Sequence, residues 1–434
     1  MSRVRIHWVS PLPPQETDIA HYTRRILPAL AAKAEVVLWT DTPGWDTELE
    51  RFASVRLFDA EAAVPMDFAS LPRGKEGTPA PVEAVFHHIG NSWVFHAAIL
   101  GLARRVPGTV VLHDLAIQEF LRDIVHNDLF DGNLYREAMI RYHGEAGRTA
   151  AEHILDGGPT PDMLERMPMF EIALDHAAAA LCHTPAGFER VKDSGLVPVY
   201  HADLPFAVSP DTGAERAPDG PLRLVQFGHI GPNRRLEQVL EALSVVRDEV
   251  PFVFDVFGRI WDDGYILSRT RDLGIAERVH FRGFAPEAEL DAALKSAHLV
   301  FNLRFPTMGE ASGSQVRIWN ASATAVVTDL GWYASLPDDC VLKIPLDDER
   351  PALIETLRTL AADRSLYTRI GTAGRARLLD RHTPEHYADA IVQIARYAEK
   401  DARERLLIDR IRNIICHTDP VARSLYTERL IDLI

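Results

Sequence analysis

The sequence has few cysteines, no long apolar run and no surplus of positive charge. Its cysteines, Cys182, Cys340 and Cys416, are too scattered for a disulfide framework or a zinc cluster, and they favour a reducing, cytoplasmic compartment. No apolar run approaches the length of a membrane span, and the N-terminal one stops at Ser10, too early for a signal peptide. With 47 basic and 62 acidic residues, the net charge is −15, which disfavours non-specific binding of nucleic acid.

Three glycine motifs are also missing. The sequence has no G-x-G-x-x-G after a predicted first strand, no G-x-x-x-x-G-K and no G-x-S-x-G. Their absence argues against a dehydrogenase, a P-loop kinase and an α/β-hydrolase. What is present is a 434-residue chain with 47% hydrophobic and 25% charged residues, which is ordinary globular usage and enough chain for two or three domains.

Predicted strands alternate with predicted helices in two successive series. The strands are expected at 4–9, 35–40, 55–58, 82–88, 109–113 and 178–182, and then at 222–227, 252–257, 279–281, 298–303 and 325–328. This order is typical of parallel sheets with right-handed crossovers. It predicts an α/β fold with two Rossmann-like domains facing across a cleft, in which ligands bind at the carboxyl ends of the strands.

The domain limits follow from composition. We expect an N-terminal domain at 1–205, a second domain at 206–385 and helices at 386–434, with a loop rich in Pro and Gly at 65–81 and a linker within 207–221. Beyond residue 395, an apolar stripe at helical spacing comprises Leu407, Ile411, Ile414 and Ile415. Packing back on the first domain and a homodimer contact are the two interpretations of this stripe.

A glycine-containing loop follows the first strand of the second series. It reads Phe227-Gly228-His229-Ile230-Gly231-Pro232-Asn233-Arg234-Arg235-Leu236 and leads into a predicted helix. Backbone N–H groups in such a loop can approach a phosphate, and Arg234 and Arg235 add positive charge. The alternative is that both arginines are solvated surface residues, although arginines near a helix N-terminus oppose its dipole.

A second loop with small residues reads Pro306-Thr307-Met308-Gly309-Glu310-Ala311-Ser312-Gly313-Ser314-Gln315. It also lies between a predicted strand and a predicted helix, so its backbone can contact an anion. Glu310 is placed to accept hydrogen bonds from sugar hydroxyls, unless it is an exposed glutamate favoured by the helix dipole alone.

Polar residues also end two strands of the first series. His113-Asp114 follows one of them, and Gly90-Asn91 with His96 follows another. The carboxyl ends of the strands face the expected cleft, which favours a role in binding. The alternatives are a histidine satisfied in the core and an ordinary turn at Gly90-Asn91.

In order and spacing, these segments resemble the family-4 retaining glycosyltransferases, which have the GT-B fold, and in particular a bacterial polysaccharide-assembly branch. The resemblance covers about residues 1–395. It rests on the segments 10–30, 89–96, 110–115, 227–236, 281–284, 306–313 and 326–331.

The resemblance implies a role for each candidate residue. His113 and Glu310 would contact the donor sugar as the catalytic pair. The residues assigned to the diphosphate are Gly228, His229, Arg234, Ala311, Ser312 and Gly313. The residues assigned to the base are Arg282, Gly283 and Phe284, and those assigned to the acceptor side are Asp18, Asn91, His96 and Asp114.

The sequence departs from the family pattern at three positions. The arginine that follows the glycine in the family is His229 here, and the second glutamate, which holds the ribose, is Ile318. The glycine-rich first loop is replaced by Glu16-Thr17-Asp18, which brings a negative charge near the diphosphate. These departures weaken the predicted phosphate clamp and ribose contact.

The resemblance implies transfer of a hexose-type sugar, with retention, from a UDP- or GDP-linked donor to a saccharide or lipid-linked acceptor in polysaccharide assembly. No metal and no cofactor are expected, nor is nucleic acid a partner. The expected location is the cytoplasm, with peripheral contact to the inner face of the plasma membrane left open. The alternatives are a non-catalytic nucleotide- or sugar-binding protein of the same fold and a nucleotide-sugar epimerase.

Overall fold

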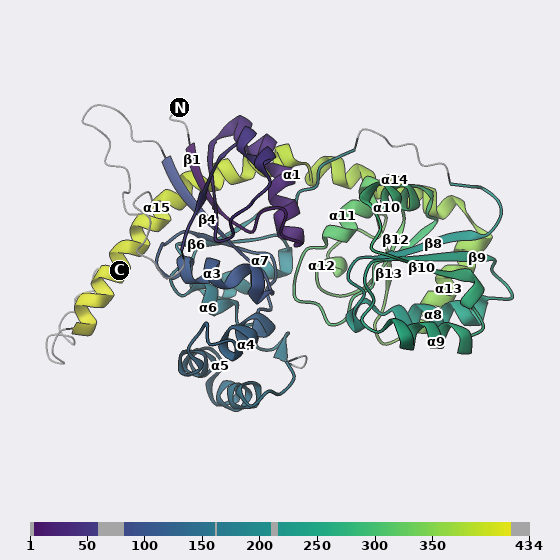
Figure 1. The fold of residues 1–434 in the computed structure, drawn as a ribbon, viewed down its shortest axis with the longest axis horizontal. Coiled ribbons are helices and arrows are strands. Elements are labelled where there is room, and N and C mark those ends of the chain that lie inside the picture. The colour runs from purple at the N-terminus through teal and green to yellow at the C-terminus, as the bar shows by residue number, and fades with distance from the viewer. Residues whose placement is uncertain (1–3, 60–81, 161–162, 210–215, 418–434) are drawn as a thin grey trace.

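A computed structural model describes residues 4–59, 82–160, 163–209 and 216–417, with only some of the side chains beyond residue 398. The predicted loop at 65–81 and part of the predicted linker lie outside these ranges. Two parallel sheets, each covered by helices, form the two halves of the molecule (Figure 1). The predicted fold of two facing Rossmann-like domains with a helical extension is therefore confirmed.

The first sheet has seven strands in the order β3-β2-β1-β4-β5-β6-β7, all paired in parallel. Its strands are β1 (Val4–Val9), β2 (Glu35–Thr40), β3 (Ser54–Leu57), β4 (Val82–Ile89), β5 (Thr109–Leu112), β6 (Ala179–Cys182) and β7 (Val199–His201). The central strands are almost wholly buried because helices cover both faces. Each step outward from β1 is a crossover, so the carboxyl ends of all strands meet at one edge.

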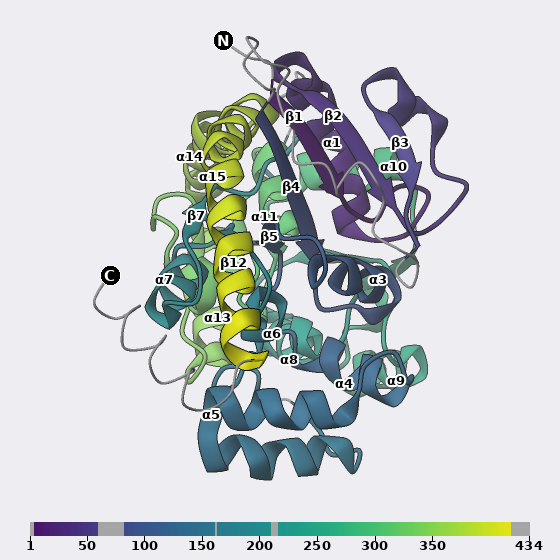
Figure 2. The same ribbon diagram turned by 90° about the vertical axis from the view of Figure 1, so that its left-hand side faces the viewer.

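The helices of this domain are α1 (Asp18–Lys33), α3 (Trp93–Ala103), α4 (Gln118–His126), α5 (Gly132–Leu155), α6 (Phe170–Leu174) and α7 (Pro185–Ser194), with a 3₁₀ turn η1 (Thr47–Arg51). Thr17 caps α1 by accepting a hydrogen bond from Ile19 N, so Asp18 is the first helical residue and not the cap. Helix α5 is bent at Gly144, where φ is 63°. Together α4 and α5 project below the sheet (Figures 1 and 2).

The second sheet has six parallel strands in the order β10-β9-β8-β11-β12-β13. Its strands are β8 (Leu222–Phe227), β9 (Phe252–Phe257), β10 (Val279–Gly283), β11 (Leu299–Phe301), β12 (Ala325–Thr328) and β13 (Leu342–Ile344). Its helices are α8 (Leu236–Val246), α9 (Asp263–Asp272), α10 (Glu287–Ser296), α11 (Gly313–Asn320), α12 (Gly331–Ala334), α13 (Glu349–Ala362) and α14 (Ser365–Arg381), with 3₁₀ turns η3 (Pro232–Arg234) and η4 (Ala276–Arg278).

The last helix, α15 (Pro384–His417), returns to the first domain and packs along α1 and β4 (Figure 2). The hydroxyl of its Tyr387 is hydrogen-bonded to that of Tyr22 on α1. Just before α15 begins, His382 O accepts a hydrogen bond from Phe206 N at 2.7 Å. Leu407 is exposed, and the side chains of the three isoleucines of the predicted stripe are not among those described. None of the described helices is both long and apolar enough to cross a membrane.

Candidate active site

Three glycines end neighbouring strands of the second sheet. Gly228, Gly258 and Gly283 follow or end β8, β9 and β10, and their φ angles of 110°, 113° and 63° favour glycine. A Cβ atom on Gly258 would lie 1.9 Å from the carbonyl oxygen of Gly228, and Gly258 N donates to Gly283 O at 2.6 Å. The three loops therefore pack backbone against backbone at this edge of the sheet.

Arg234 lies over this edge. Its Nη2 atom is 3.5 Å from the position of a Cβ on Gly228, and its Nη1 donates to Asn302 Oδ1 at 3.3 Å. Gln226 Nε2 donates a hydrogen bond to the backbone carbonyl of Arg234 at 2.8 Å. Burial and the nearby charge of Arg304 lower the pKa of Arg234 to about 10, so it stays charged at neutral pH. Among the described residues, no carboxylate is ion-paired with it.

The two adjacent arginines of the loop have different roles. Arg235 forms a two-pronged ion pair with the buried Glu349, with Nη2–Oε2 and Nε–Oε2 distances of 2.6 and 3.0 Å. Its charge is therefore already neutralised within the domain. Arg235 is thus not a freely solvated surface residue, and its contribution of charge to a phosphate site stays a prediction. His229, the third basic residue here, is exposed.

Glu310 is held inside the second loop. Its Oε2 accepts from Met308 N at 2.7 Å and from Thr307 Oγ1 at 2.9 Å, and its Oε1 is ion-paired with Arg304. The side chains of Glu310 and Arg304 are only 12% and 15% exposed. The alternative of an exposed glutamate at a helix terminus is thus wrong. Ser312 is the residue that caps α11, by accepting from Gln315 N at 3.1 Å.

Asn302 joins the two loops and was not predicted from the sequence. Besides accepting from Arg234, it donates from Nδ2 to Gln315 Oε1 at 2.9 Å and to Ser312 Oγ at 3.4 Å. Arg304 follows two residues later and was also missed. The signal was polar residues at alternate positions after an apolar strand, in Phe301-Asn302-Leu303-Arg304.

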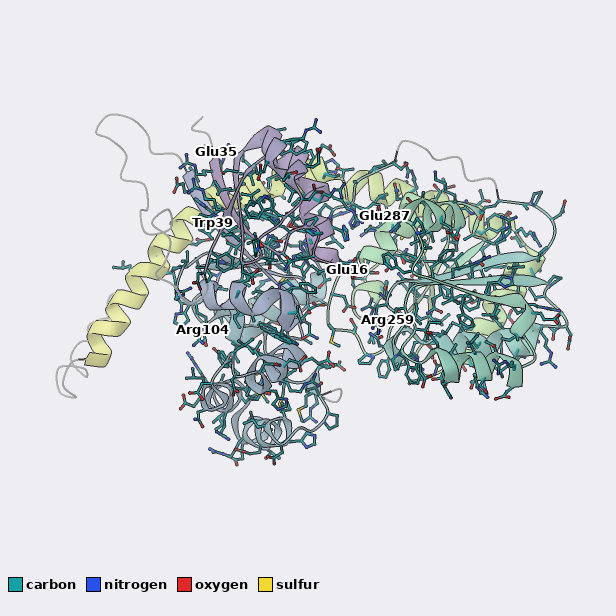
Figure 3. All side chains as sticks on the ribbon, in the orientation of Figure 1. Glu16, Glu35, Trp39, Arg104, Arg259 and Glu287 are labelled. Carbon is teal, nitrogen blue, oxygen red and sulfur yellow. The ribbon has the colours of Figure 1, made fainter. Side chains whose placement is uncertain are left out.

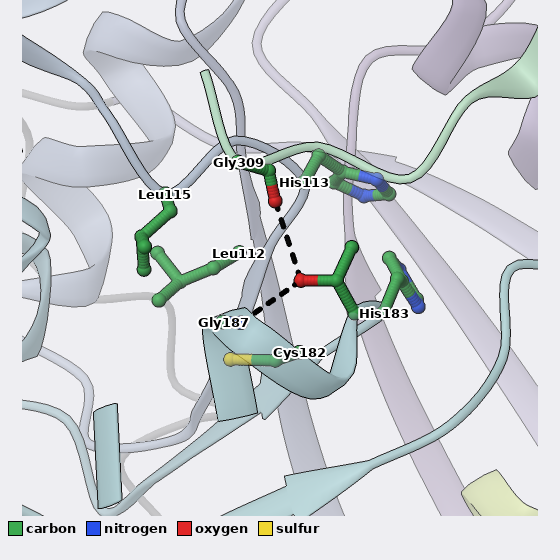
Figure 4. A pocket seen from close by; sticks show the side chains of 8 residues that line it. Leu112, His113, Leu115, Cys182, His183, Gly187 and Gly309 are labelled. Atoms are coloured by element: carbon green, nitrogen blue, oxygen red, sulfur yellow. Dashed lines mark hydrogen bonds between the residues drawn. The ribbon is translucent and has the colours of Figure 1, made fainter. Parts of the chain in front are cut away.

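The second loop is docked onto the first domain. Met308 O accepts from Leu115 N and from Ala116 N, each at 2.8 Å, and Thr184 Oγ1 donates to Gly309 O at 3.3 Å. Figure 4 shows this crevice, in which Gly309 and Leu115 are labelled. Thr184 also lines it. A Cβ on Gly309 would lie 2.7 Å from Leu115 Cβ, so the contact needs glycine. The crevice itself leaves no room for a bound molecule.

His113 lines this crevice within a cluster of buried rings. Its Nε2 is 2.9 Å from His88 Nδ1, and its ring lies 5.0 Å from that of Tyr22 and 5.1 Å from that of His183. Burial, together with His183 and His88, holds the pKa of His113 well below its usual range. His113 is therefore neutral at neutral pH.

Asp114 lies next to this cluster and faces the second domain. Its Oδ2 accepts from Asn91 N at 2.7 Å. Burial, followed by the negative charge of Glu310, raises the pKa of Asp114 to about 7. The structure thus brings Asp114 and Glu310, which come from different domains, into electrostatic contact.

The other residues predicted on the acceptor side are engaged within the first domain. Asn91 donates to Glu119 Oε2 at 3.1 Å and accepts from Phe120 N at 2.9 Å, while His96 is 1% exposed, with its Nδ1 3.0 Å from His88 O. Asp18 is exposed and close enough to interact with Arg234 and Arg304.

The predicted base-binding residues lie at the end of β10. Arg282 is paired with Asp255, with Nε 2.7 Å from Oδ1, and Phe284 is 95% exposed. Ile318 is fully buried in the core of the second domain, so its side chain cannot take the place of the family's ribose-binding glutamate. Figure 3 places Glu16, Arg259 and Glu287 along the boundary between the domains.

No group of three His, Cys, Asp or Glu side chains in the described ranges is arranged to hold a metal ion.

Two facing Rossmann-like domains, with a final helix that returns to the first, define the GT-B fold. Residues 234–393 match the family described as "Glycosyl transferase-like". No curated protein matches the chain by sequence. The resemblance to glycosyltransferases of the GT-B fold is thus confirmed by the fold and by the match of the second domain.

Solved structures share this fold at low sequence identity. Sucrose-phosphate synthase from Thermosynechococcus elongatus aligns with a TM-score of 0.60 and 16% identity, over 91% of this chain and 99% of that one. HepE from Anabaena, solved with UDP and glucose, gives 0.57 and 12% over 90% and 99%. WaaB, a lipopolysaccharide outer core galactosyltransferase, gives 0.53 and 11% over 90% and 99%.

Proposed function

We propose that this protein is a retaining glycosyltransferase that moves a hexose-type sugar from a nucleotide diphosphate sugar to a saccharide or glycolipid acceptor in polysaccharide assembly. The observation that carries the proposal is the occurrence of two side chains at one edge of a glycosyltransferase-like domain. They are Arg234, which is ion-paired with no carboxylate in the described part of the chain, and Glu310, which is held by hydrogen bonds. The cation suits a diphosphate, and the carboxylate suits sugar hydroxyls.

The chemistry needs charge stabilisation at two points. As the donor bond breaks, negative charge builds on the diphosphate and positive charge builds on the anomeric carbon. Arg234 and the backbone N–H groups at the start of α11 would stabilise the diphosphate. Glu310 would hold the sugar, and the neutral His113 would donate a hydrogen bond to it.

Retention would follow from attack on the same face that the leaving group occupies. The departing phosphate oxygen would accept the proton of the acceptor hydroxyl, so the new bond forms as the old one breaks, with no protein nucleophile. Donors linked to UDP are the first to test, because HepE was solved with UDP and with UDP-glucose. GDP-linked donors are the second choice.

The proposal is tested with a panel of nucleotide sugars and saccharide acceptors. Nucleotide diphosphate release and product formation are followed together, and the anomeric configuration of the product is measured by proton NMR coupling. An inverted product would contradict retention. Nucleotide binding without transfer would favour the non-catalytic alternative, which the burial of Ile318 supports. Conversion of the donor without an acceptor would favour an epimerase.

We expect transfer to persist in EDTA. Arginine and helix N–H groups can balance the diphosphate charge without an ion, so no metal is assigned to this site. The measurement is the initial rate before and after chelation, with magnesium added back as the control. Loss of activity in EDTA that magnesium or manganese restores would contradict this expectation.

A further inference from the structure

Two arginines approach each other at the carboxyl edge of the second sheet. Arg234 follows β8 and Arg304 follows β11, and these strands are neighbours in the sheet. We propose that Arg304, and not His229, is the second cation of the diphosphate site, an inference that rests on the proposed function. Arg304 would bind the diphosphate with one side of its guanidinium while the other side keeps Glu310 in place.

The guanidinium of Arg304 has donors to spare. It is paired with one carboxylate, that of Glu310, whose second oxygen is already held by Met308 N and Thr307 Oγ1. Its Nε is buried and has no hydrogen-bond partner in the described part of the chain. Since an arginine presents five N–H donors in a planar fork, the group can take a second anion without releasing the first.

A second buried donor lies beside the two arginines. The hydroxyl of Tyr333, on α12, interacts electrostatically with both Arg234 and Arg304, and it has no hydrogen-bond partner among the described residues. A buried hydroxyl without a partner is costly, and so are two like charges placed together. Both costs fall when an anion binds between these groups.

The placement of Arg304 is rigid. Its backbone N donates to Thr328 Oγ1 at 3.0 Å, which ties it to the end of β12. Burial alone would lower its pKa, but Glu310 and its other neighbours outweigh this effect and raise it, so the group is always charged. His229, by contrast, is exposed.

This arrangement places the sugar as well as the phosphates. A diphosphate held by Arg234 and Arg304 has its attached sugar next to Glu310, which Arg304 already contacts. Arg304 would therefore couple donor binding to the position of the glutamate. The exposed Asp18 and the protonatable Asp114 also face Arg304. Their negative charges would repel a diphosphate, and a second cation would offset this repulsion.

The test compares two variants that both lack the Glu310 charge. Glu310→Gln keeps Arg304, whereas the double variant Glu310→Gln/Arg304→Gln removes it without leaving a buried carboxylate unpaired. Affinities for UDP and GDP, and for UMP and GMP, are measured by calorimetry. We expect the double variant to bind the diphosphates about ten- to a hundredfold more weakly than Glu310→Gln, and the monophosphates to lose less.

The matched control uses the other buried Arg–Glu pair of the same domain. Glu349→Gln and Glu349→Gln/Arg235→Gln differ in the same chemical way, but Arg235 points to Glu349 and not to the proposed site. These two proteins should bind the diphosphates within about twofold of each other.

The outcomes separate the inference from the proposed function. If the wild type binds UDP or GDP and removal of Arg304 leaves that affinity unchanged, the inference is overturned and the proposed function stands. If the wild type binds neither, nor ADP, CDP or TDP, both are overturned. An equal loss for diphosphate and monophosphate would overturn the assignment of Arg304 to the second phosphate.

Discussion

A buried carboxylate needs a partner, and Asp114 and Glu310 meet this need in different ways at the domain boundary. Glu310 has a guanidinium on one oxygen and a backbone amide and a hydroxyl on the other. Asp114 has the backbone N–H of Asn91, and its pKa is raised to about 7. Asp114 is thus poised between the acid and the ion at neutral pH.

Replacement of Glu310 should damage transfer more than binding. Glu310→Gln removes a contact to the donor sugar that tightens as charge develops, so we expect turnover to fall by about a hundredfold or more. The melting temperature should also fall, because Arg304 loses its carboxylate partner. Steady-state rates and thermal unfolding measure the two effects.

The matched control is Glu349→Gln, which deprives Arg235 of a buried carboxylate in the same way. It should lower the melting temperature and leave turnover per folded molecule near that of the wild type. A normal rate for Glu310→Gln would mean that this residue does not hold the sugar.

Replacement of Asp114 should change how stability depends on pH. The folded protein keeps the Asp114 proton up to about pH 7, whereas the unfolded chain loses it near 3.8, so ionisation costs the wild type stability as pH rises between these values. Asp114→Asn keeps an oxygen for Asn91 N and removes this cost. We expect the variant to gain on the wild type from pH 4 to pH 7, by up to about 4 kcal/mol in the free energy of unfolding.

Denaturant unfolding of both proteins at several pH values is the measurement. The wild type serves as its own reference near pH 3, where the carboxyl is largely protonated in both states. A difference between the two proteins that does not vary with pH would contradict the raised pKa.

At the scale of elements, the loop 306–310 is one part of the second domain that touches the first. Leu115 N, Ala116 N and Thr184 Oγ1 all donate to carbonyls of this loop, which also carries Glu310. The docking of the domains and the position of the glutamate are therefore set by the same few residues. A change in this loop should act on both.

Gly309→Ala tests this link. Its φ of 78° strains any other residue, and the added Cβ would clash with Leu115 Cβ at 2.7 Å. We expect the interdomain hydrogen bonds to loosen, turnover to fall by about tenfold or more and UDP affinity to change less, given that backbone strain of this kind costs about 1–3 kcal/mol. Rates, calorimetry and small-angle scattering are the measurements.

Gly274→Ala is the control for backbone strain alone. Its φ is 67°, but no atom lies within 4 Å of the added Cβ. If both variants lose the same activity, the contact with Leu115 has no part in positioning Glu310.

The elements themselves were largely predictable from the sequence. Apolar strands with turn residues between them located β1, β2, β8, β9 and β12 at their observed limits. The strands β7 and β13 were missed because three residues carry too little pattern, and the bend of α5 at Gly144 was missed because it interrupts an otherwise helical segment.

The candidate residues were selected from two kinds of sequence pattern, and their roles stay predictions. His113 and Asp114 directly follow β5, whereas Arg234 and Glu310 lie in the glycine-containing loops after β8 and β11. Arg304 and Asn302 were missed because their importance depends on partners in another loop, and the neutralisation of Arg235 by Glu349, 114 residues away in the chain, has no local signal.

At the scale of the whole molecule, the first domain carries an unusual number of buried histidines. Burial lowers the pKa values of His87, His96 and His183 to about 4, and it holds those of His88 and His113 well below their usual range. They are neutral in the folded state at all pH values above about 4. In the unfolded chain, each takes up a proton below its ordinary pKa of 6.5.

These histidines should make the protein sensitive to acid. Below pH 6.5 the unfolded state binds more protons than the folded state, so the free energy of unfolding falls as pH decreases towards 4. Each histidine contributes up to about 1.4 kcal/mol per pH unit in this window. Asp114 has the opposite effect, because its raised pKa makes the free energy of unfolding increase as pH falls. It is a single group, so the histidines should dominate the dependence of stability on pH.

His87→Gln isolates one of these contributions away from the interdomain crevice. His87 bonds through Nε2 to Val106 O at 3.0 Å, and its Nδ1 has no partner among the described residues, so a protonated ring would be poorly compensated there. Between pH 6.5 and 4.5, the slope of stability against pH should be smaller for this variant by up to about 1.4 kcal/mol per unit.

His126→Gln removes an exposed histidine and should leave the slope unchanged. If both variants keep the slope of the wild type, the acid sensitivity does not come from buried neutral histidines, and carboxylates paired in the folded state, such as Asp203 with Arg381, would be its source.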